Sequence, residues 1–224
     1  PSRGEVSVSN LGGHTATYLT NFAGGNTYPS GWQRPMYSVI DGICYVDGEV
    51  TVRSWGHLLT LPPDCRPSKS IGFSLNNHEN QARVDVSSDG RVVWRAGGHQ
   101  HGWLLLSGMV FQTTSASPTY LTNFAGGNTY PSGWQRPMYS VIDGICYVDG
   151  EVTVRSWGHL LTLPPDCRPS KSIGFSLNNH ENQARVDVSS DGRVVWRAGG
   201  HQHGWLLLSG MMFHVDILPP PPPP

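Results

Sequence analysis

The stretch ARVDVSSDGRVVWRAGGHQHGW occupies Ala82–Trp103 and occurs again, letter for letter, at Ala184–Trp205. The identity extends to both sides of this stretch, because the whole of Thr17–Met109 recurs as Thr119–Met211. A repeat of about 100 residues has the usual size of a protein domain and can bury enough surface to fold by itself. The chain of 224 residues therefore predicts two tandem domains with one fold.

Each copy of this stretch has the pattern of a β-hairpin. Val84 and Val86 alternate with polar residues, and Val92 and Trp94 have the same spacing after the turn. A three-residue loop ending at Gly90, which tolerates a left-handed backbone, sets Val86 opposite Val92 and Val84 opposite Trp94. A two-residue Asp-Gly turn would instead put an arginine on the apolar face, so the longer loop is predicted.

The rest of each repeat has the pattern of short strands joined by turns. The whole chain has 27 glycines and 18 prolines, and within the repeats these residues separate segments rich in Val, Ile, Tyr and Trp. In the first repeat the predicted strands are Tyr37–Val46, Glu49–Trp55, Leu58–Leu61, Ile71–Leu75, Ala82–Val86, Arg91–Arg95 and Trp103–Phe111. We therefore expect an all-β protein with two tandem antiparallel β-sandwich, jelly-roll-like domains, at residues 17–111 and 119–213.

The segments outside the repeats have compositions of their own. In the N-terminal extension, residues 1–16, Val6 and Val8 alternate with polar residues, which predicts a strand that pairs with a neighbouring subunit. Residues 112–118 form a short polar linker, and the tail at 214–224 ends in a proline run that favours a polyproline II rod. The tail prolines are Pro219, Pro220, Pro221, Pro222, Pro223 and Pro224. We expect both ends to take part in assembly.

Charge and cysteine content narrow the class of protein. The net charge is -1 and only 14% of residues are charged, so nucleic-acid binding and a polybasic membrane contact are not expected. The apolar runs are too short to insert into a membrane.

One cysteine pair per repeat, Cys44 with Cys65 and Cys146 with Cys167, predicts two disulfides in an extracellular or cell- or virion-surface protein. Buried free thiols are the alternative.

The second half of each repeat resembles a module at the ends of bacteriophage tail-fibre and baseplate proteins. The resemblance is carried by TLP at 60–62, RPS at 66–68, ARVDV at 82–86, the Asp89-Gly90 turn and WLLLSG at 103–108. It implies a β-sandwich used in fibres and host attachment, often as a trimer. The cysteine pair and the proline tail depart from that pattern. The tail is similar in composition to the hydroxyproline-rich glycoproteins of green algae, which implies prolines that carry sugars.

A polar stretch, SLNNHENQAR at 74–83, carries the side chains best suited to a glycan. Amide and charged groups can bond sugar hydroxyls, and a tryptophan offers a face for a sugar ring. The candidate residues are Trp32, Asn76, Asn77, His78, Glu79, Asn80 and Arg83, with Trp134, Asn178, Asn179, His180, Glu181, Asn182 and Arg185 in the second repeat. The simpler explanation is a polar loop beside tryptophans of the core.

The GGHQHG loop is a candidate for a metal site. Histidines two residues apart on an extended segment point the same way, as metal ligands must. These residues are His99, His101, His201 and His203. Two ligands from one loop are too few without help from other chains, so an exposed glycine-rich loop is favoured and no cofactor is expected.

The missing catalytic motifs and the identity of the two copies indicate which functions to expect. An enzyme is not expected. His78-Glu79 begins like the HExxH motif of zinc proteases, but Ala82 occupies the position of the second histidine. The sequence also has no nucleophile elbow and no P-loop. A fibre or a multivalent binder uses every copy in the same way. The sequence therefore predicts a non-catalytic structural subunit of an extracellular fibre or filament that binds copies of itself through its termini. A tandem-repeat lectin or host-attachment protein is the alternative, and a polysaccharide-cleaving enzyme comes third.

Overall fold

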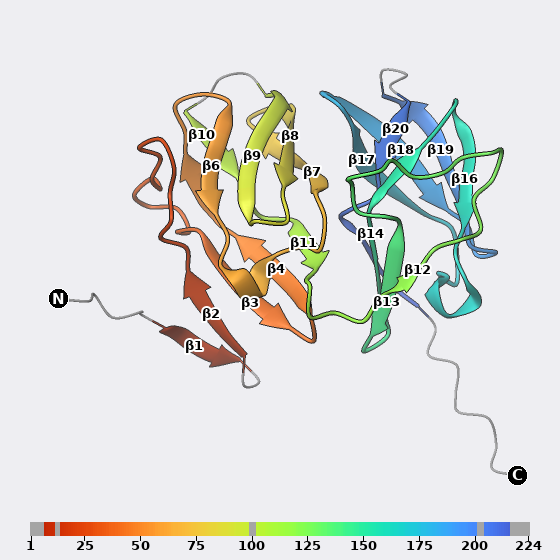
Figure 1. Ribbon diagram of the computed structural model, residues 1–224, viewed down its shortest axis with the longest axis horizontal. Helices are drawn as coiled ribbons and strands as arrows, with labels where there is room; N and C mark the ends of the chain where they lie inside the picture. Colours follow the sequence, from red (N-terminus) through yellow and green to blue (C-terminus); the bar gives the residue numbers. More distant parts are fainter. Residues whose placement is uncertain (1–6, 12–13, 99–101, 201–203, 216–224) are drawn as a thin grey trace, which may run out of the picture.

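The computed structural model describes residues 7–11, 14–98, 102–200 and 204–215. These residues form an all-β protein that is 53% strand and contains no α-helix. Four small antiparallel sheets of four or five strands are arranged like the blades of a four-bladed β-propeller (Figure 1). Two shorter strand pairs complete the fold.

Repeat 1 supplies two of the four sheets. The first has the order β1-β2-β3-β4-β11, the second has the order β6-β9-β8-β7, and β5 pairs with β10. The strands are β1 (Ser7–Leu11), β2 (His14–Tyr18), β3 (Met36–Ile40), β4 (Ile43–Asp47), β5 (Glu49–Thr51), β6 (Gly56–Thr60), β7 (Ile71–Asn77), β8 (Asn80–Val86), β9 (Arg91–Gly97), β10 (Trp103–Leu105) and β11 (Met109–Gln112). A 3-10 helix, Pro63–Cys65, leads from β6 toward β7.

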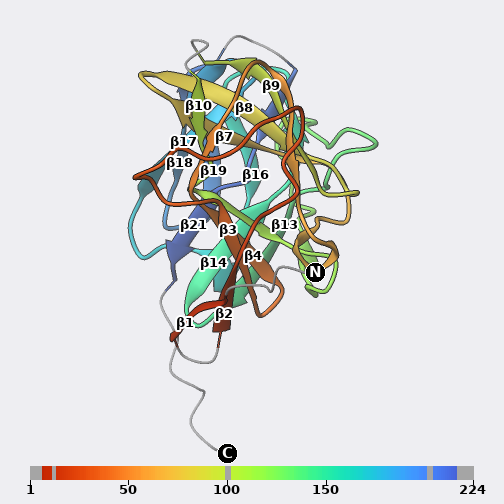
Figure 2. The same cartoon turned by 90° about the vertical axis from the view of Figure 1, so that its left-hand side faces the viewer.

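Repeat 2 supplies the other two sheets. Their orders are β12-β13-β14-β21 and β16-β19-β18-β17, and β15 pairs with β20. The strands are β12 (Thr119–Tyr120), β13 (Met138–Ile142), β14 (Ile145–Asp149), β15 (Glu151–Thr153), β16 (Gly158–Thr162), β17 (Ile173–Asn179), β18 (Asn182–Val188), β19 (Arg193–Gly199), β20 (Trp205–Leu207) and β21 (Met211–His214). The second 3-10 helix is Pro165–Cys167. Figure 2 shows that corresponding sheets of the two repeats lie at the same end of the molecule.

The prediction of two tandem β-sandwich, jelly-roll-like domains is wrong. The segment predicted as one strand at Tyr37–Val46 folds back on itself, because Asp41 and Gly42 have φ angles of 50° and 80° and form a hairpin turn between β3 and β4. The segment Trp103–Phe111 is likewise divided, with a turn at Gly108 between β10 and β11. These turns distribute the strands over four small sheets, where the prediction had two large facing sheets in each repeat.

The register predicted for the β8–β9 hairpin is confirmed. Val86 pairs with Val92 and Val84 pairs with Trp94, and all four side chains are buried. Gly90 has a φ of 88°, the left-handed conformation that the three-residue loop requires. The pair belongs to the apolar core of repeat 1, and repeat 2 has a separate core of corresponding residues around Trp196.

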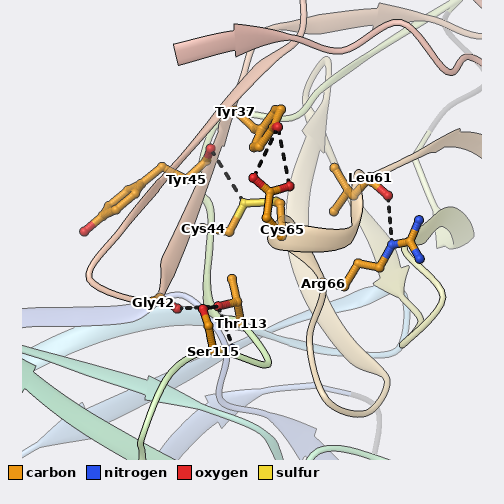
Figure 3. The surroundings of a disulfide bond; sticks show 10 residues. Tyr37, Gly42, Cys44, Tyr45, Leu61, Cys65, Arg66, Thr113 and Ser115 are labelled. Carbon is orange, nitrogen blue, oxygen red and sulfur yellow. Dashed lines mark hydrogen bonds between the residues drawn. A yellow bond between two sulfur atoms is a disulfide. The ribbon is translucent and has the colours of Figure 1, made fainter. Parts of the chain in front are cut away.

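The two predicted disulfides are present. Cys44 bonds to Cys65 and Cys146 bonds to Cys167, each with a Cα–Cα distance of 5.4 Å. Figure 3 shows that the first bond ties β4 to the 3-10 helix that leads into the other sheet. Closing a loop of this length stabilises a domain by about 3 kcal/mol. The disulfides indicate an oxidising, extracellular or secreted environment.

The first two residues of the segment predicted as a linker pack against repeat 1, and Thr114, Ser115 and Ser117 are exposed. Thr113 donates its backbone N–H and its hydroxyl to the carbonyl oxygen of Gly42, at 2.8 and 3.0 Å (Figure 3). Gln112 and Thr113 are both buried. In the part of the chain that the structure describes, no helix is long and apolar enough to cross a membrane.

Candidate functional site

The two repeats are joined by a continuous polar and apolar interface. Ser70 forms a parallel β-bridge with Trp134, and the backbone N–H of Gln135 donates to the carbonyl oxygen of Ser70 at 2.8 Å. The Ser68 hydroxyl donates to the amide oxygen of Gln135 at 2.7 Å. Repeat 1 thus presents the entry to β7, and repeat 2 presents the loop before β13.

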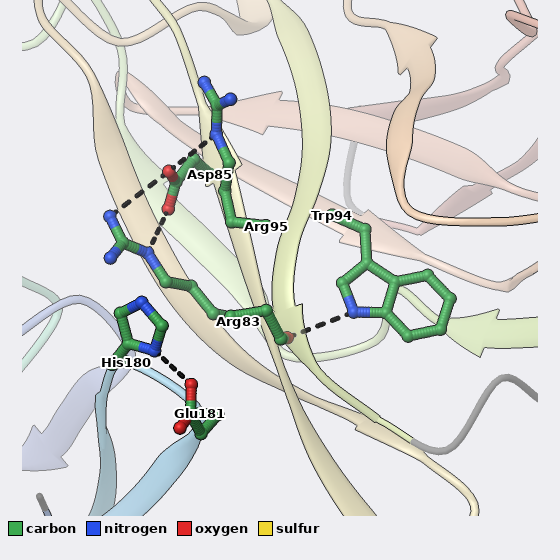
Figure 4. A network of polar contacts seen from close by, with 7 residues as sticks. Arg83, Asp85, Trp94, Arg95, His180 and Glu181 are labelled. Atoms are coloured by element: carbon green, nitrogen blue, oxygen red, sulfur yellow. Dashed lines mark hydrogen bonds and ion pairs between the residues drawn. The ribbon is translucent and has the colours of Figure 1, made fainter.

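Arg83 on β8 is central to this interface. Its Nε donates to Asp85 at 2.8 Å, and its guanidinium lies 4.4 Å from the ring centre of Trp205 and 5.1 Å from that of Trp134. Arg95 donates to the same carboxylate at 3.1 Å. Figure 4 shows the contacts of Arg83 and Arg95 with Asp85. Cation–π contacts that are shielded from water contribute about 1–2 kcal/mol each.

Two acidic side chains of repeat 2 are buried at the interface. Asp149 accepts a hydrogen bond of 2.8 Å from the backbone N–H of Gln112, and burial raises the pKa of its carboxyl to about 6. Burial likewise raises the pKa of Glu151 to about 7, although the nearby positive charge of Arg83 opposes the shift and Asp85 adds to it. Both groups therefore hold a proton more readily while the repeats are packed.

Corresponding tyrosines meet across the interface. The hydroxyl groups of Tyr45 and Tyr147 are 2.7 Å apart and their rings are inclined by 83°. Strands β7 and β17, which also correspond, lie side by side (Figure 1). Identical parts of two copies meet in this way only close to the axis of the rotation that relates the copies.

Away from this axis, the interface joins two different faces. The groove face of repeat 1 consists of Gly72, Gln81, Arg83 and Asp85 on β7 and β8. The tryptophan face of repeat 2 consists of Trp134, Gln135, Asp149, Trp205 and Leu207. Gly72 lies directly against Leu207, where a methyl group on the glycine would come within 2.6 Å of the leucine. The amide nitrogen of Gln81 donates to the carbonyl oxygen of Leu177 at 3.4 Å.

Each repeat carries both faces, so one of each remains open. The second groove face consists of Gly174, Gln183, Arg185 and Asp187. Its first three residues line a groove of about 520 Å³ together with Phe175, Ser176, Ala198 and Gly199. The second tryptophan face consists of Trp32, Gln33, Asp47, Trp103 and Leu105. The side chain of Arg185 is 68% exposed, whereas that of Arg83 is 11% exposed. Trp32 is 63% exposed, whereas Trp134 is half-buried.

The predicted glycan residues occupy the β7–β8 and β17–β18 hairpins and their surroundings. Asn76 to Asn80 are brought together in one tight turn, in which His78 has a φ of 63° and its ring contacts Glu79. Asn77 and Asn179 are buried and donate to the carbonyl oxygens of Trp103 and Trp205. Asn178 is buried as well, and His180 contacts Glu181. Arg83 and Trp134 do not join the turn but meet each other across the interface.

Other predicted residues lie outside this site. Val8 belongs to β1, which pairs with β2 of its own chain, so the strand already has a partner on one side. Within 7–11, 14–98, 102–200 and 204–215, no cluster of three or more His, Cys, Asp or Glu side chains could hold a metal ion. The candidates outside the described residues are Val6, His99, His101, His201, His203 and Pro219 to Pro224.

Sequence reasoning did not find the acidic and amide groups of the interface. Asp149 and Gln135 have exposed counterparts of identical sequence context, Asp47 and Gln33, so no local signal distinguishes the buried copy from the open one. Glu151 corresponds to Glu49, which is buried in its own repeat. The usable signal is where the identity ends, because Gln112 at the interface corresponds to His214 in the second repeat.

Comparisons of the chain with protein-family models, curated protein sequences and solved structures found no match. The resemblance to phage fibre modules therefore stays a prediction. Function has to be argued from the two faces and from the fold that presents them.

Proposed function

We propose that the protein is a non-catalytic structural subunit of an extracellular fibre, in which it assembles with copies of itself. The observation that carries the proposal is the packing of two identical repeats through two different faces, with one further copy of each face left open. An interface of this heterologous kind lets each open face bind the complementary face of another copy. An assembling subunit needs this property, whereas a bivalent binding protein does not.

The first sheet offers a second route of assembly. Strand β1 ends the strand order of its sheet, so the outer edge of β1 can add a strand from a neighbour. We assign growth along the fibre to this edge and to the proline tail. The contacts between repeats would then build the width of the fibre.

The disulfides support an extracellular location. Two disulfides are suited to a secreted protein. Attachment to the surface of a cell or a virion, with sugars on the tail prolines, is the more specific form of the proposal.

Electron microscopy of the purified protein in negative stain tests the fibre function. We expect filaments whose axial repeat matches one or two modules and whose number rises with protein concentration. Discrete particles at every concentration would contradict the fibre function.

Glycan binding is a second candidate function, and one observation favours it. Trp55 and Trp157 occupy corresponding positions and are 51% and 52% exposed, so packing of the repeats leaves both of them accessible. Each ring lies 6.4 Å from the ring of a buried tryptophan, Trp94 or Trp196, which supports it from behind. A pair of rigid aromatic platforms suits two sugar rings.

A glycan array tests this second function. We expect binding that falls modestly for Trp55→Ala and much further for the variant that also carries Trp157→Ala, because avidity is lost with the second site. An array without signal, or equal binding by the double variant, would rule out these platforms.

A further inference from the structure

We propose that a second copy of this chain docks its open tryptophan face, led by Trp32, into the open groove beside Arg185. The contacts between chains would repeat those already made inside one chain. This inference rests on the proposed fibre function and names the partner, the two faces and the contacts. The same kinds of contact can form between chains, because the residues of each open face are identical to those of the corresponding face that is already in contact inside the chain.

The contacts inside the chain specify the partners residue by residue. Arg83 lies over Trp134 and Trp205, so Arg185 would lie over Trp32 and Trp103 of the second copy. By the same correspondence, Leu105 would pack on Gly174, as Leu207 packs on Gly72. Gln33 would bond Ser170 and Ser172, as Gln135 bonds Ser68 and Ser70.

The open groove already has the geometry of the closed one. The Nε and Nη2 atoms of Arg185 donate to Asp187 at 2.9 and 3.2 Å, and those of Arg83 donate to Asp85 at 2.8 and 3.2 Å. Nothing in this pair has to rearrange before a tryptophan face docks. Preorganisation of this kind lowers the free-energy cost of association.

The one polar difference at the interface preserves the hydrogen bonds. The amide oxygen of Gln112 accepts from Ser140 at 2.6 Å, and its backbone N–H donates to Asp149. His214 stands in the corresponding place in repeat 2. Its backbone N–H is unchanged, and its ring nitrogen can accept the hydroxyl hydrogen of Ser38 in the second copy.

The position of the rotation axis sets the size of the assembly. Because Tyr45 meets Tyr147 and β7 meets β17, the rotation that carries repeat 1 onto repeat 2 includes little shift along its axis. A rotation without such a shift keeps every repeat at one level, so its repetition closes into a ring when a whole number of steps completes a full turn. A twofold axis would join two like faces, whereas this interface joins unlike faces, so two repeats do not close a ring. Each chain supplies two repeats, so a closed ring contains an even number of repeats. The smallest closed ring that uses whole chains therefore contains four repeats from two chains.

Native mass spectrometry and analytical ultracentrifugation of the full chain test this docking. We expect a dimer of about 49 kDa, twice the 24.5 kDa of one chain. Trp32→Ala and Arg185→Ala should each weaken the dimer at least about 10-fold, because tryptophan and arginine dominate such interfaces. The matched controls are Trp55→Ala and Arg193→Ala, which remove exposed residues of the same types outside both faces and should leave the dimer unchanged.

Mixing the two interface variants is the sharper test. Each homodimer has both junctions damaged, whereas a dimer of one Trp32→Ala chain and one Arg185→Ala chain keeps one junction intact. We expect the mixture to form heterodimers at concentrations where either variant alone is monomeric. Dimers that both variants form normally, or a mixture that stays monomeric, would overturn the docking.

The two proposals fail in different ways. A wild-type chain that forms filaments, with Trp32→Ala and Arg185→Ala variants that dimerise as well as it does, would overturn this docking and leave the fibre function standing. Dimers that depend on both residues but never form filaments would support the docking and overturn the fibre function. A wild-type chain that is monomeric at every concentration would overturn both.

Discussion

The Arg83–Asp85 pair and the Arg185–Asp187 pair have the same sequence context and nearly the same hydrogen bonds, but different electrostatics. In repeat 1 burial raises the pKa of Asp85, although Arg83 and Arg95 oppose the shift. In repeat 2 the hydrogen bond from Arg185 lowers the pKa of Asp187. The difference arises because repeat 2 covers the first pair and nothing in the described chain covers the second. The charge behaviour of a residue is thus set by what packs on it.

The same comparison separates a finished interface from an unfinished one. Trp134 is partly covered by the groove face of repeat 1, whereas its counterpart Trp32 is among the most exposed large apolar residues described. A single sequence therefore provides a permanent contact in one place and an open face in another. Substitutions at corresponding positions measure what the contact contributes.

The largest expected difference is between Arg83→Ala and Arg185→Ala. Removing Arg83 leaves Asp85 and Glu151 buried without their nearest positive charge, and such a loss costs about 3–4 kcal/mol of unfolding free energy. Removing Arg185 breaks an exposed pair and costs less than about 1 kcal/mol. Urea unfolding of the monomeric chain at low concentration, followed by tryptophan fluorescence, measures both.

Alanine at position 95 is the control for this comparison. Arg95 bonds to Asp85 but its side chain is 56% exposed, so Arg95→Ala should resemble Arg185→Ala more than Arg83→Ala. Equal losses for Arg83→Ala and Arg185→Ala would show that the contact between repeats does not stabilise the chain.

A smaller effect is expected from pH. The pKa values of Asp149 and Glu151, about 6 and about 7, lie above their ordinary values, so the packed state holds protons that the unfolded chain releases. Their contribution to stability is fully present below about pH 4 and is lost as the pH rises through 6 and 7. Between pH 5 and pH 8 we expect the packed repeats to lose about 4 kcal/mol.

The variant Asp149→Asn with Glu151→Gln checks the assignment. It keeps the size of both side chains and removes their titration, so the difference in stability between pH 5 and pH 8 should shrink by that amount. Asp187 and Asp89 have lowered pKa values, and the stability that they contribute is lost only below the ordinary carboxyl pKa. An unchanged pH dependence would show that these two carboxyls are not the groups that titrate.

The sequence predicted local pairing better than it predicted architecture. Alternation at Val84, Val86, Val92 and Trp94 defines one buried face, so the register of the hairpin could be predicted and is confirmed. Within Tyr37–Val46 the Asp41-Gly42 pair is a hairpin signal that the prediction missed. The grouping of strands into sheets has no comparable local signal. The cysteine pairs were predictable from their number and their placement in the repeat.

The interface was not predictable for a different reason. Identical sequences carry no information on which copy of Arg83 or Arg185 is covered, since that depends on the rotation between the repeats. Both arginines were predicted to bind a glycan, whereas Arg83 lies against two tryptophans of the other repeat. Symmetry between repeats thus hides a site from inspection of either repeat alone.

The smallest effect is expected at the one contact where the two copies are equivalent. Tyr45→Phe and Tyr147→Phe each remove one hydrogen bond of 2.7 Å and should each cost about 1 kcal/mol of unfolding free energy. The double variant should cost little more than either single variant, because the second hydroxyl has already lost its partner. The matched controls Tyr28→Phe and Tyr130→Phe, at exposed positions, should have no effect. Additive losses in the double variant would show that the two hydroxyls do not bond to each other, and the axis that closes the ring would then lie elsewhere.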